Sequence, residues 1–280
     1  MSLKLLAHAK INWSLAITGE RANGYHDLDM LMQRIDLADE ICLERAQVLS
    51  LTVNGQRLPT DGRNLVIKAA EALIEFSGKR MGARIRLKKH IPARAGLGGG
   101  SADCAAALLG LNELWNLRLP LSLLTQIGLK LGADVPFCLQ GGFAHVRGVG
   151  EILTPLAAAP RAHLALVTPG GGLSTPQVFK AWNASGCVPR AIDSVALAEA
   201  LIAGDFERAQ QLSRNDLEAP AIALMPEIGQ CMRAFREAGA RYVRMSGSGS
   251  SVFAVFDSPH AAKAAADNIP GAIATQTCTR

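Results

Sequence analysis

The chain has 280 residues, of which 49 % are apolar and 19 % are charged, so it is long and apolar enough to bury a sizeable core. It contains no low-complexity tract and no block of like charges, which excludes a disordered polyelectrolyte, and no apolar run approaches the roughly 18 residues of a membrane helix. The formal net charge of +5 suits an anionic partner such as a nucleotide, and also nucleic acid; Lys and Arg are spread along the chain, which argues against nucleic acid.

The first third of the chain predicts strands. Residues 5–17 alternate between apolar and polar side chains, which indicates a strand with one face on the core. The turn-rich segment 19–24 follows. Two further strands are expected at residues 39–44 and 49–53, and the second of these ends in the hairpin signal Asn54-Gly55.

The middle of the chain adds helices around a glycine-rich loop. Apolar spacing predicts a helix over residues 65–76, and alternation predicts a strand over residues 83–91. The glycine-rich loop comes next, and helices are expected over residues 102–115 and 122–131.

The last part of the chain is predicted to form a second lobe. The stretch 156–160 indicates a boundary, so we expect an N-terminal lobe of residues 1–158 and a C-terminal lobe of residues 159–280. Within the second lobe the pattern predicts a strand at 162–168, several helices between 193 and 239, strands at 242–245 and 251–256, a helix at 259–268 and a final strand. Strands and helices without steady alternation favour an α+β protein with two lobes.

The glycine-rich loop is the central motif, and it consists of Pro92, Ala93, Arg94, Ala95, Gly96, Leu97, Gly98, Gly99, Gly100, Ser101 and Ala102. Glycines let the backbone approach an anion, and the N-terminus of the following helix offers unpaired N–H groups, so the pattern favours phosphate binding. The Walker loop is excluded because no Lys follows the glycines, and the dinucleotide fingerprint fails because Ser101 occupies its last position. The alternative is a plain connection in which Ser101 caps the helix. Four glycines in five residues exceed what a connection needs.

This loop resembles the phosphate loop of the GHMP kinases. The segments Ala9-Lys10-Ile11-Asn12, Arg21 to His26 and Leu131 to Pro136 are similar to the branch that phosphorylates a cytidine-diphospho methylerythritol, and Ser246 to Gly249 is similar to the third motif of the family. The resemblance runs from about Ala7 to Phe256. It implies phosphoryl transfer from ATP to the 2-hydroxyl of that substrate, in the non-mevalonate isoprenoid pathway. It also implies a two-lobed fold, with an N-terminal lobe of the ribosomal S5 domain-2 type and the active site in the cleft between the lobes.

The resemblance implies a role for each candidate site residue. Asp134 would be the catalytic base and Lys10 would pair with it, while Asn12 would orient the substrate hydroxyls. Tyr25 and Phe179 would sandwich the cytosine ring, His26 would hydrogen-bond its edge, and Thr175 would contact the diphosphate or a hydroxyl. Asn64, Leu65 and Lys89 would lie near the purine of ATP.

Structural alternatives stay open for several of these residues. Asp134 could form a turn after a helix, and Phe179 could be a core residue of a short helix. Lys10 and Lys89 could be solvated lysines, and Asn64 could cap a helix. Cys104, where the family often has Ala, could be reactive or an inert buried thiol.

The expected metal is Mg²⁺, because it enters with the ATP phosphates and needs few protein ligands. No residue stands out as a metal ligand, although Ser101 and Ser248 could reach the phosphates or the ion.

The six cysteines are scattered without a C-x-x-C pair and the start lacks an export signal, so we expect reduced thiols and a cytoplasmic protein. A small-molecule substrate is the expected partner, without nucleic acid or membrane, and the sequence leaves the choice of monomer or homodimer open. The alternatives are a GHMP kinase for another small alcohol, an RNA-binding protein and a ligand sensor that has lost its chemistry.

Overall fold

The computed structural model describes residues 2–22 and 24–279. Its packing divides the chain into two compact units. The first contains the residues up to Ala9, then Leu37–Ile91 and Gly98–Gln140; the second contains Lys10–Asp36, Pro92–Leu97 and the chain from Gly141 onward. Asn23, in the motif before Tyr25, lies outside the described residues.

Two long strands contribute residues to both units. These strands are β1 (Ser2–Glu20) and β2 (His26–Ala46), and they pair with each other. The alternation predicted over residues 5–17 is confirmed as a strand, but only its first part has an exposed face. From Ala9 to Ile17 every side chain is buried. The polar positions of this stretch tolerate burial because they form hydrogen bonds, for example from the Leu31 amide to the Ser14 hydroxyl at 3.2 Å.

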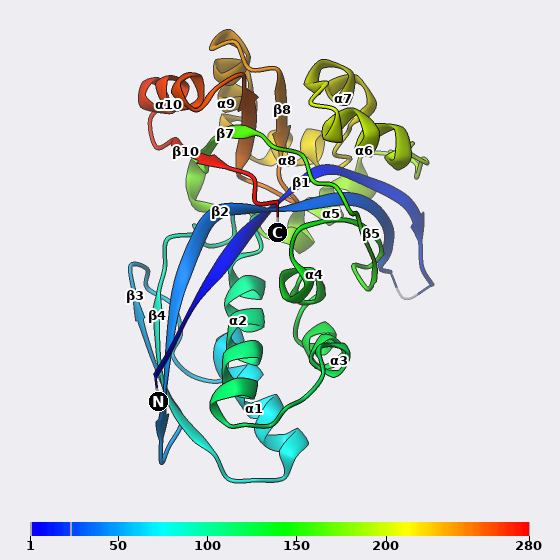
Figure 1. Ribbon diagram of the computed structural model, residues 1–280. Coiled ribbons are helices and arrows are strands. Elements are labelled where there is room, and N and C mark those ends of the chain that lie inside the picture. The colour runs from blue at the N-terminus through cyan, green and yellow to red at the C-terminus, as the bar shows by residue number, and fades with distance from the viewer. Residues whose placement is uncertain (1, 23, 280) are drawn as a thin grey trace. The chain divides into compact units, whose positions relative to one another are not determined.

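The first unit is a small sheet with helices on one face (Figure 1). Its elements after β1 and β2 are β3 (Ser50–Asn54), α1 (Leu65–Ser77), β4 (Gly82–Lys88), α2 (Gly99–Leu114), α3 (Leu121–Leu131) and α4 (Val135–Gln140). Residues 40–46 of β2 pair antiparallel with β4, and β3 pairs parallel with β4. Ala83, Ile85 and Leu87 of β4 point into the core beneath α1 and α2, and the basic residues between them are exposed. The core of this unit therefore lies between the sheet and the helices.

The second unit holds the rest of the strands and helices. Its elements are β5 (Phe143–Gly148), β6 (Ile152–Pro155), β7 (His163–Val167), a 3₁₀ turn (Pro169–Gly171), α5 (Thr175–Ala184), α6 (Ser194–Ile202), α7 (Phe206–Leu212), α8 (Glu218–Leu224), α9 (Glu227–Glu237), β8 (Tyr242–Met245), β9 (Val252–Phe256), α10 (Pro259–Asn268) and β10 (Ile273–Gln276). Residues 28–33 of β2 pair with β5, which pairs with β6. A second, antiparallel sheet has the order β10-β7-β9-β8. Trp13 is fully buried in this unit, where its ring packs edge-on against Tyr242 and Phe253.

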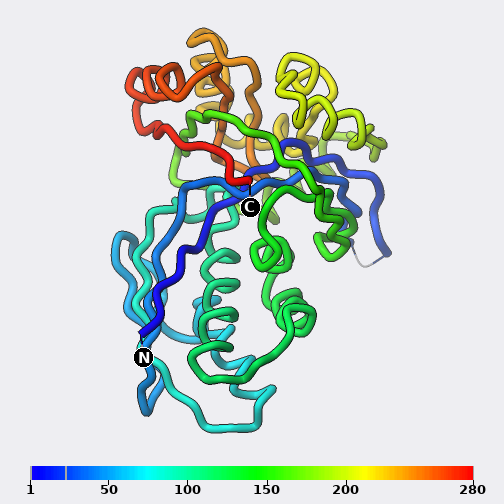
Figure 2. Tube along the Cα trace, in the orientation of Figure 1, coloured from blue at the N-terminus to red at the C-terminus, as the bar shows by residue number. Residues whose placement is uncertain are grey.

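The predicted α+β class and most predicted elements are confirmed, one local prediction is wrong, and one local alternative is excluded. Asn54-Gly55 does not form a hairpin, because β3 and β4 are parallel and α1 connects them, a path that can be followed in the trace of Figure 2. Gly55 has a φ of 90° and serves another purpose: a side chain there would collide with the carbonyl of Lys89. Ser101 is not the helix cap, since α2 already begins at Gly99 and Gly98 is its N-cap.

The lobe boundary near residue 158 stays a prediction. The packing instead changes unit between Gln140 and Gly141, and it assigns residues 10–36 and 92–97 to the second unit. None of the helices in the described part of the chain has the length and apolar character that a bilayer crossing requires.

Candidate active site

The first half of the glycine-rich loop is held by strand β1 and by the turn between β8 and β9. The Ser246 hydroxyl accepts a hydrogen bond from the Asn12 amide at 3.2 Å and donates one to the Gly96 carbonyl at 2.9 Å. The amide of Lys10 donates to the Leu97 carbonyl at 3.0 Å. Gly96 has a φ of 75°, and a Cβ there would overlap the Ser246 carbonyl oxygen. A side chain at Gly96 is therefore incompatible with the contact between the two loops.

The side chain of Asn215 holds the turn that follows β8. Its side-chain amide donates to the carbonyls of Met245 and Gly247, both at 2.8 Å. The sequence pattern does not single out this residue. An Asn that precedes a short helix has the appearance of an ordinary cap, and only the fold brings it to the turn.

Lys10 and Asn12 lie next to each other on β1 and are buried, with 4 % and 1 % of their surface exposed. The Lys10 ammonium donates to the Asn12 Oδ1 at 2.7 Å, and the Asn12 amide group reaches the Met30 sulfur at 3.4 Å. A solvated lysine is thereby excluded at this position. Burial of an ammonium group costs free energy unless nearby charges or dipoles compensate for it, so Lys10 requires polar partners at this position.

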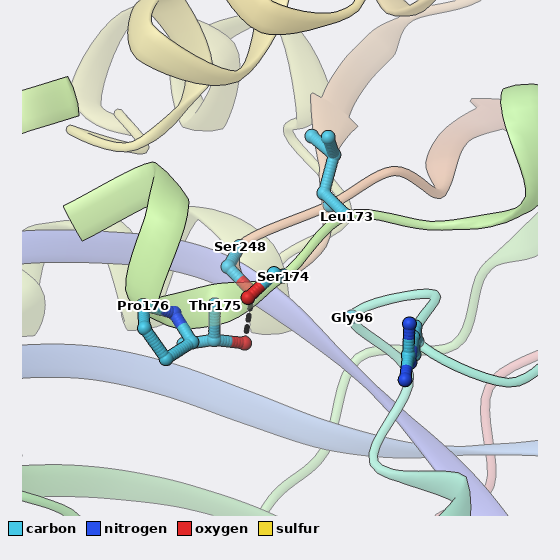
Figure 3. A pocket seen from close by; sticks show the side chains of 8 residues that line it. Gly96, Leu173, Ser174, Thr175, Pro176 and Ser248 are labelled. Carbon is cyan, nitrogen blue, oxygen red and sulfur yellow. Dashed lines mark hydrogen bonds between the residues drawn. The ribbon is translucent and has the colours of Figure 1, made fainter. Parts of the chain in front are cut away.

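A pocket of about 310 Å³ opens beside this loop in the second unit. Its lining residues are Arg94, Gly96, Leu173, Ser174, Thr175, Pro176, Ser248 and Gly249. The hydroxyls of Thr175 and Ser248 are hydrogen-bonded to each other at 2.7 Å, as Figure 3 shows. Arg94 has a φ of 55°, and its carbonyl accepts from the Leu173 amide at 3.1 Å. One guanidinium, several hydroxyls and glycine backbone form a lining suited to an anion.

His26 lies in an aromatic cluster with residues of α5. Its ring stacks on Phe179 with centroids 5.0 Å apart, and it meets Trp182 edge-on at 5.2 Å. Its Nε2 is 2.8 Å from the Oδ1 of Asn183, and with that oxygen accepting, Nε2 carries a proton. His26 is 7 % exposed, whereas Tyr25 is 63 % exposed. The predicted residues Tyr25, His26 and Phe179 thus fall in one region, and Asn183 is a partner that the sequence analysis missed.

The second half of the loop forms the first turn of α2 in the first unit. Gly98, with a φ of 67°, is the N-cap, and its carbonyl accepts from the Ala102 amide at 2.8 Å. The N–H groups of the first turn have no partner within an α-helix, so Gly99, Gly100 and Ser101 present donors at the positive end of the helix dipole. This geometry suits a phosphate group.

The three residues predicted near the purine occupy different environments. Asn64 caps α1, accepting from the Val66 amide at 3.0 Å and donating to the Pro59 carbonyl at 2.8 Å, so the capping alternative is confirmed. Leu65 lies beside the loop, since a Cβ on Gly100 would be 3.6 Å from its Cδ1. Lys89 is buried rather than solvated.

Lys89 is the centre of a buried charge cluster that the sequence analysis did not predict. Its ammonium bonds to Asp39 and, at 2.6 Å, to the Oδ2 of Asp103. The Asp103 Oδ1 is buried and has no hydrogen-bond partner among the described residues. Burial raises the pKa of Asp103 to about 7, an effect that Lys89 opposes and Asp39 reinforces. One signal was available: Asp39 is in phase with the core residues Ile41 and Leu43.

Asp134 lies between α3 and α4 and is half-buried. Its carbonyl accepts from the Cys138 amide at 3.0 Å, so its backbone begins α4, as the turn-forming alternative expects. Its side-chain role stays a prediction.

Cys104 is fully buried, and burial raises the pKa of its thiol to about 12, so it is an inert thiol.

Comparison with known proteins agrees with this arrangement. Residues 64–142 match the GHMP kinases N terminal domain, and residues 197–273 match the GHMP kinases C terminal domain. A 4-diphosphocytidyl-2-C-methyl-D-erythritol kinase of Cereibacter sphaeroides is 46 % identical over 268 residues, covering 94 % of this chain and 92 % of its own. One from Pelotomaculum thermopropionicum is 44 % identical over 255 residues, covering 90 % and 88 %.

Solved structures give the same result. The crystal structure of a 4-(cytidine 5'-diphospho)-2C-methyl-D-erythritol kinase superposes with a TM-score of 0.84 at 37 % identity, over 98 % of this chain and 99 % of that one. A homoserine kinase from Cytophaga hutchinsonii superposes with a TM-score of 0.75 at 24 % identity, over 99 % and 95 %, and shares the fold. This chain therefore belongs to the GHMP kinases, ATP-dependent kinases of small molecules, and within them to the family of the 4-diphosphocytidyl-2-C-methyl-D-erythritol kinases.

Proposed function

We propose that this chain transfers the γ-phosphoryl group of ATP to the 2-hydroxyl of 4-diphosphocytidyl-2-C-methyl-D-erythritol, a step of the non-mevalonate route to isoprenoid precursors. The observation that carries the proposal is the glycine-rich loop, whose close backbone contacts and helix N-terminus suit phosphate, in a chain 46 % identical to a kinase of that name. The loop residues Pro92 to Ala102 bind the ATP phosphates, with Leu65 near the purine. The two hydrogen bonds of Asn64, one to the first turn of α1 and one to Pro59, order this side of the nucleotide site.

The acceptor substrate occupies the second unit. Its cytosine ring lies between Tyr25 and Phe179, and His26 binds the edge of the ring. In the neutral ring, an Nε2–H that donates to Asn183 leaves Nδ1 to accept from the cytosine amino group. The diphosphate occupies the pocket beside Thr175, where the cation and hydroxyls of the lining offset its charge.

Asp134 is the proposed base and Lys10 the proposed electrostatic group. Phosphoryl transfer depends mainly on positioning and on charge stabilisation, with a carboxylate that receives the proton of the attacking hydroxyl. The buried Lys10 ammonium stabilises the negative charge that develops on the transferred group, and Asn12 fixes its direction through the 2.7 Å hydrogen bond.

Mg²⁺ is proposed to enter with ATP and to draw most of its ligands from phosphate oxygens and water. The hydroxyls of Ser101 and Ser248 are hard oxygen donors of the type that such an ion prefers. When bound, the ion neutralises phosphate charge. We also propose a cytoplasmic protein without a nucleic-acid partner, which the six free cysteines and the dispersed basic residues support.

The test is ADP release from Mg-ATP with 4-diphosphocytidyl-2-C-methyl-D-erythritol, with mevalonate and homoserine as comparison alcohols. Asp134→Asn and Lys10→Met are expected to lower kcat about 10²- to 10⁴-fold. Lys4→Met, on the same strand but exposed, is the matched control and is expected to retain wild-type turnover. Turnover of a comparison alcohol in place of the cytidine substrate would refute the proposed substrate, and unchanged kcat in Asp134→Asn would refute the proposed base.

A further inference from the structure

We propose that Asp39, Lys89 and Asp103 form a clasp that fastens the two ends of the glycine-rich loop together and thereby sets the position of the loop for phosphate. The clasp residues are positioning residues and do not touch the nucleotide. The proposal rests on the assignment of this loop to the ATP phosphates. It goes beyond that assignment because it replaces the expected contact between Lys89 and the purine.

The segment that enters the loop is pinned through its backbone. The Oδ1 of Asp39 accepts from the amides of His90 at 2.5 Å and Ile91 at 2.8 Å. The Lys89 amide donates to the Asn54 carbonyl at 2.8 Å, and the Gln56 side chain donates to the Ile91 carbonyl at 2.7 Å. The chain therefore leaves β4 in one fixed direction, directly before Pro92.

The segment that leaves the loop is tied to the same point. Asp103 lies in the second turn of α2, and its Oδ2 accepts from the Lys89 ammonium at 2.6 Å. Gly99 makes this approach possible, because a Cβ there would lie 2.9 Å from the Ile91 side chain and 3.4 Å from the Lys89 ammonium. The segments before and after the loop are thus both bound at Lys89, which fixes the two points between which the loop runs.

The charge balance excludes a direct role of Lys89 in binding phosphate. Its side chain is 3 % exposed, and it faces two carboxylates that are 0 % and 4 % exposed. An ammonium already held by the Asp39 carboxylate and the Asp103 carboxyl group has no charge to offer a ligand unless it leaves them. Its function is therefore to join the two ends, as a buried ionic network specifies one geometry where apolar packing would allow several. A displacement of the loop by about 1 Å is enough to weaken contacts to a bound phosphate substantially.

The experiment compares the binding of two probes, the non-hydrolysable triphosphate AMP-PNP and adenosine, which has no phosphate. The test variant is Lys89→Met/Asp103→Asn, which removes the bridge without leaving two carboxylates facing each other and keeps the Asp39 contacts to the amides. Asp39→Asn is a second, milder variant, because it retains an oxygen for those amides. The matched control is Lys88→Met, the same change at the neighbouring residue, whose exposed ammonium pairs with the partly buried Glu40 at 3.1 Å.

Selective loss of phosphate binding is the expected result. Both clasp variants are expected to bind AMP-PNP at least about tenfold more weakly than Lys88→Met does, while their affinity for adenosine stays within about twofold. Equal weakening of both probes would overturn the proposal, because it would mean that Lys89 contacts the nucleoside. Unchanged binding of both probes with only a lower thermal midpoint would also overturn it, since the cluster would then be purely structural. If wild type bound AMP-PNP no more tightly than adenosine, the phosphate assignment of the loop would itself fail.

Discussion

Replacing Asp103 by Asn is expected to remove a pH-dependent loss of stability. Asp103 is 3 % exposed, and its pKa is raised from 3.8 to about 7 in the folded chain, mainly by burial. Two carboxylates share one ammonium at this site, so one carboxylate charge is uncompensated whenever both are ionised. An amide at position 103 keeps an acceptor for Lys89 and carries no charge.

The direction in which stability changes with pH follows from the number of protons that the folded and unfolded chains bind. Between about pH 4 and pH 7 the unfolded chain has lost the Asp103 proton and the folded chain retains it, so the stability conferred by this group falls as the pH rises through that window. A pKa difference of about 3 corresponds to a total loss on the order of 4 kcal/mol, since each tenfold step is about 1.36 kcal/mol.

The assay is urea unfolding of wild type and Asp103→Asn at intervals between about pH 5 and pH 8. The free energy of unfolding of wild type is expected to fall relative to that of the variant by a few kcal/mol over this range. Asp267→Asn, which removes an exposed carboxylate that pairs with Lys263, is the control and is expected to follow the wild-type profile. Parallel pH profiles for wild type and Asp103→Asn would refute the reasoning.

Three further substitutions test other parts of the site. Gly96→Ala places a Cβ on the Ser246 carbonyl in a backbone with φ of 75°, so turnover is expected to fall at least about tenfold; near-normal turnover would mean that the loops separate without cost. Asn183→Leu removes the partner that fixes the tautomer of His26, so the preference for a cytidine over a uridine substrate, measured by kcat/KM, is expected to fall about tenfold, and an unchanged ratio would contradict this. Tyr242→Phe leaves a buried main-chain carbonyl of β1 without its donor, which should cost about 1–3 kcal/mol in urea unfolding while kcat changes little; wild-type stability would show that another donor replaces the phenol.

The sequence by itself determined most of the local structure and the position of the glycine-rich loop. The alternation in residues 83–91 predicts β4 because side chains on a strand alternate between two faces, and α10 begins and ends where Pro259 and Asn268 predict. The glycines of the loop could be recognised because their use depends on backbone conformation, which is a local property. Period-two alternation could not show that both faces of β1 are buried between Ala9 and Ile17, since burial of the polar face depends on distant partners such as Ser246.

Only the tertiary structure decided which polar side chains meet. Asp39 lies on β2 in phase with Ile41, and Lys89 directly follows β4 in phase with Leu87, so both fall on the core side. A charge on an apolar face is a signal for a buried partner. The sequence could not identify that partner, because 50 residues separate Lys89 from Asp39 and 14 separate it from Asp103. Pairing of β2 with β4 and the packing of α2 on that sheet bring the three together. A charge cluster of this kind is set by strand register and helix packing, which are collective properties of the fold and are not encoded in any one segment.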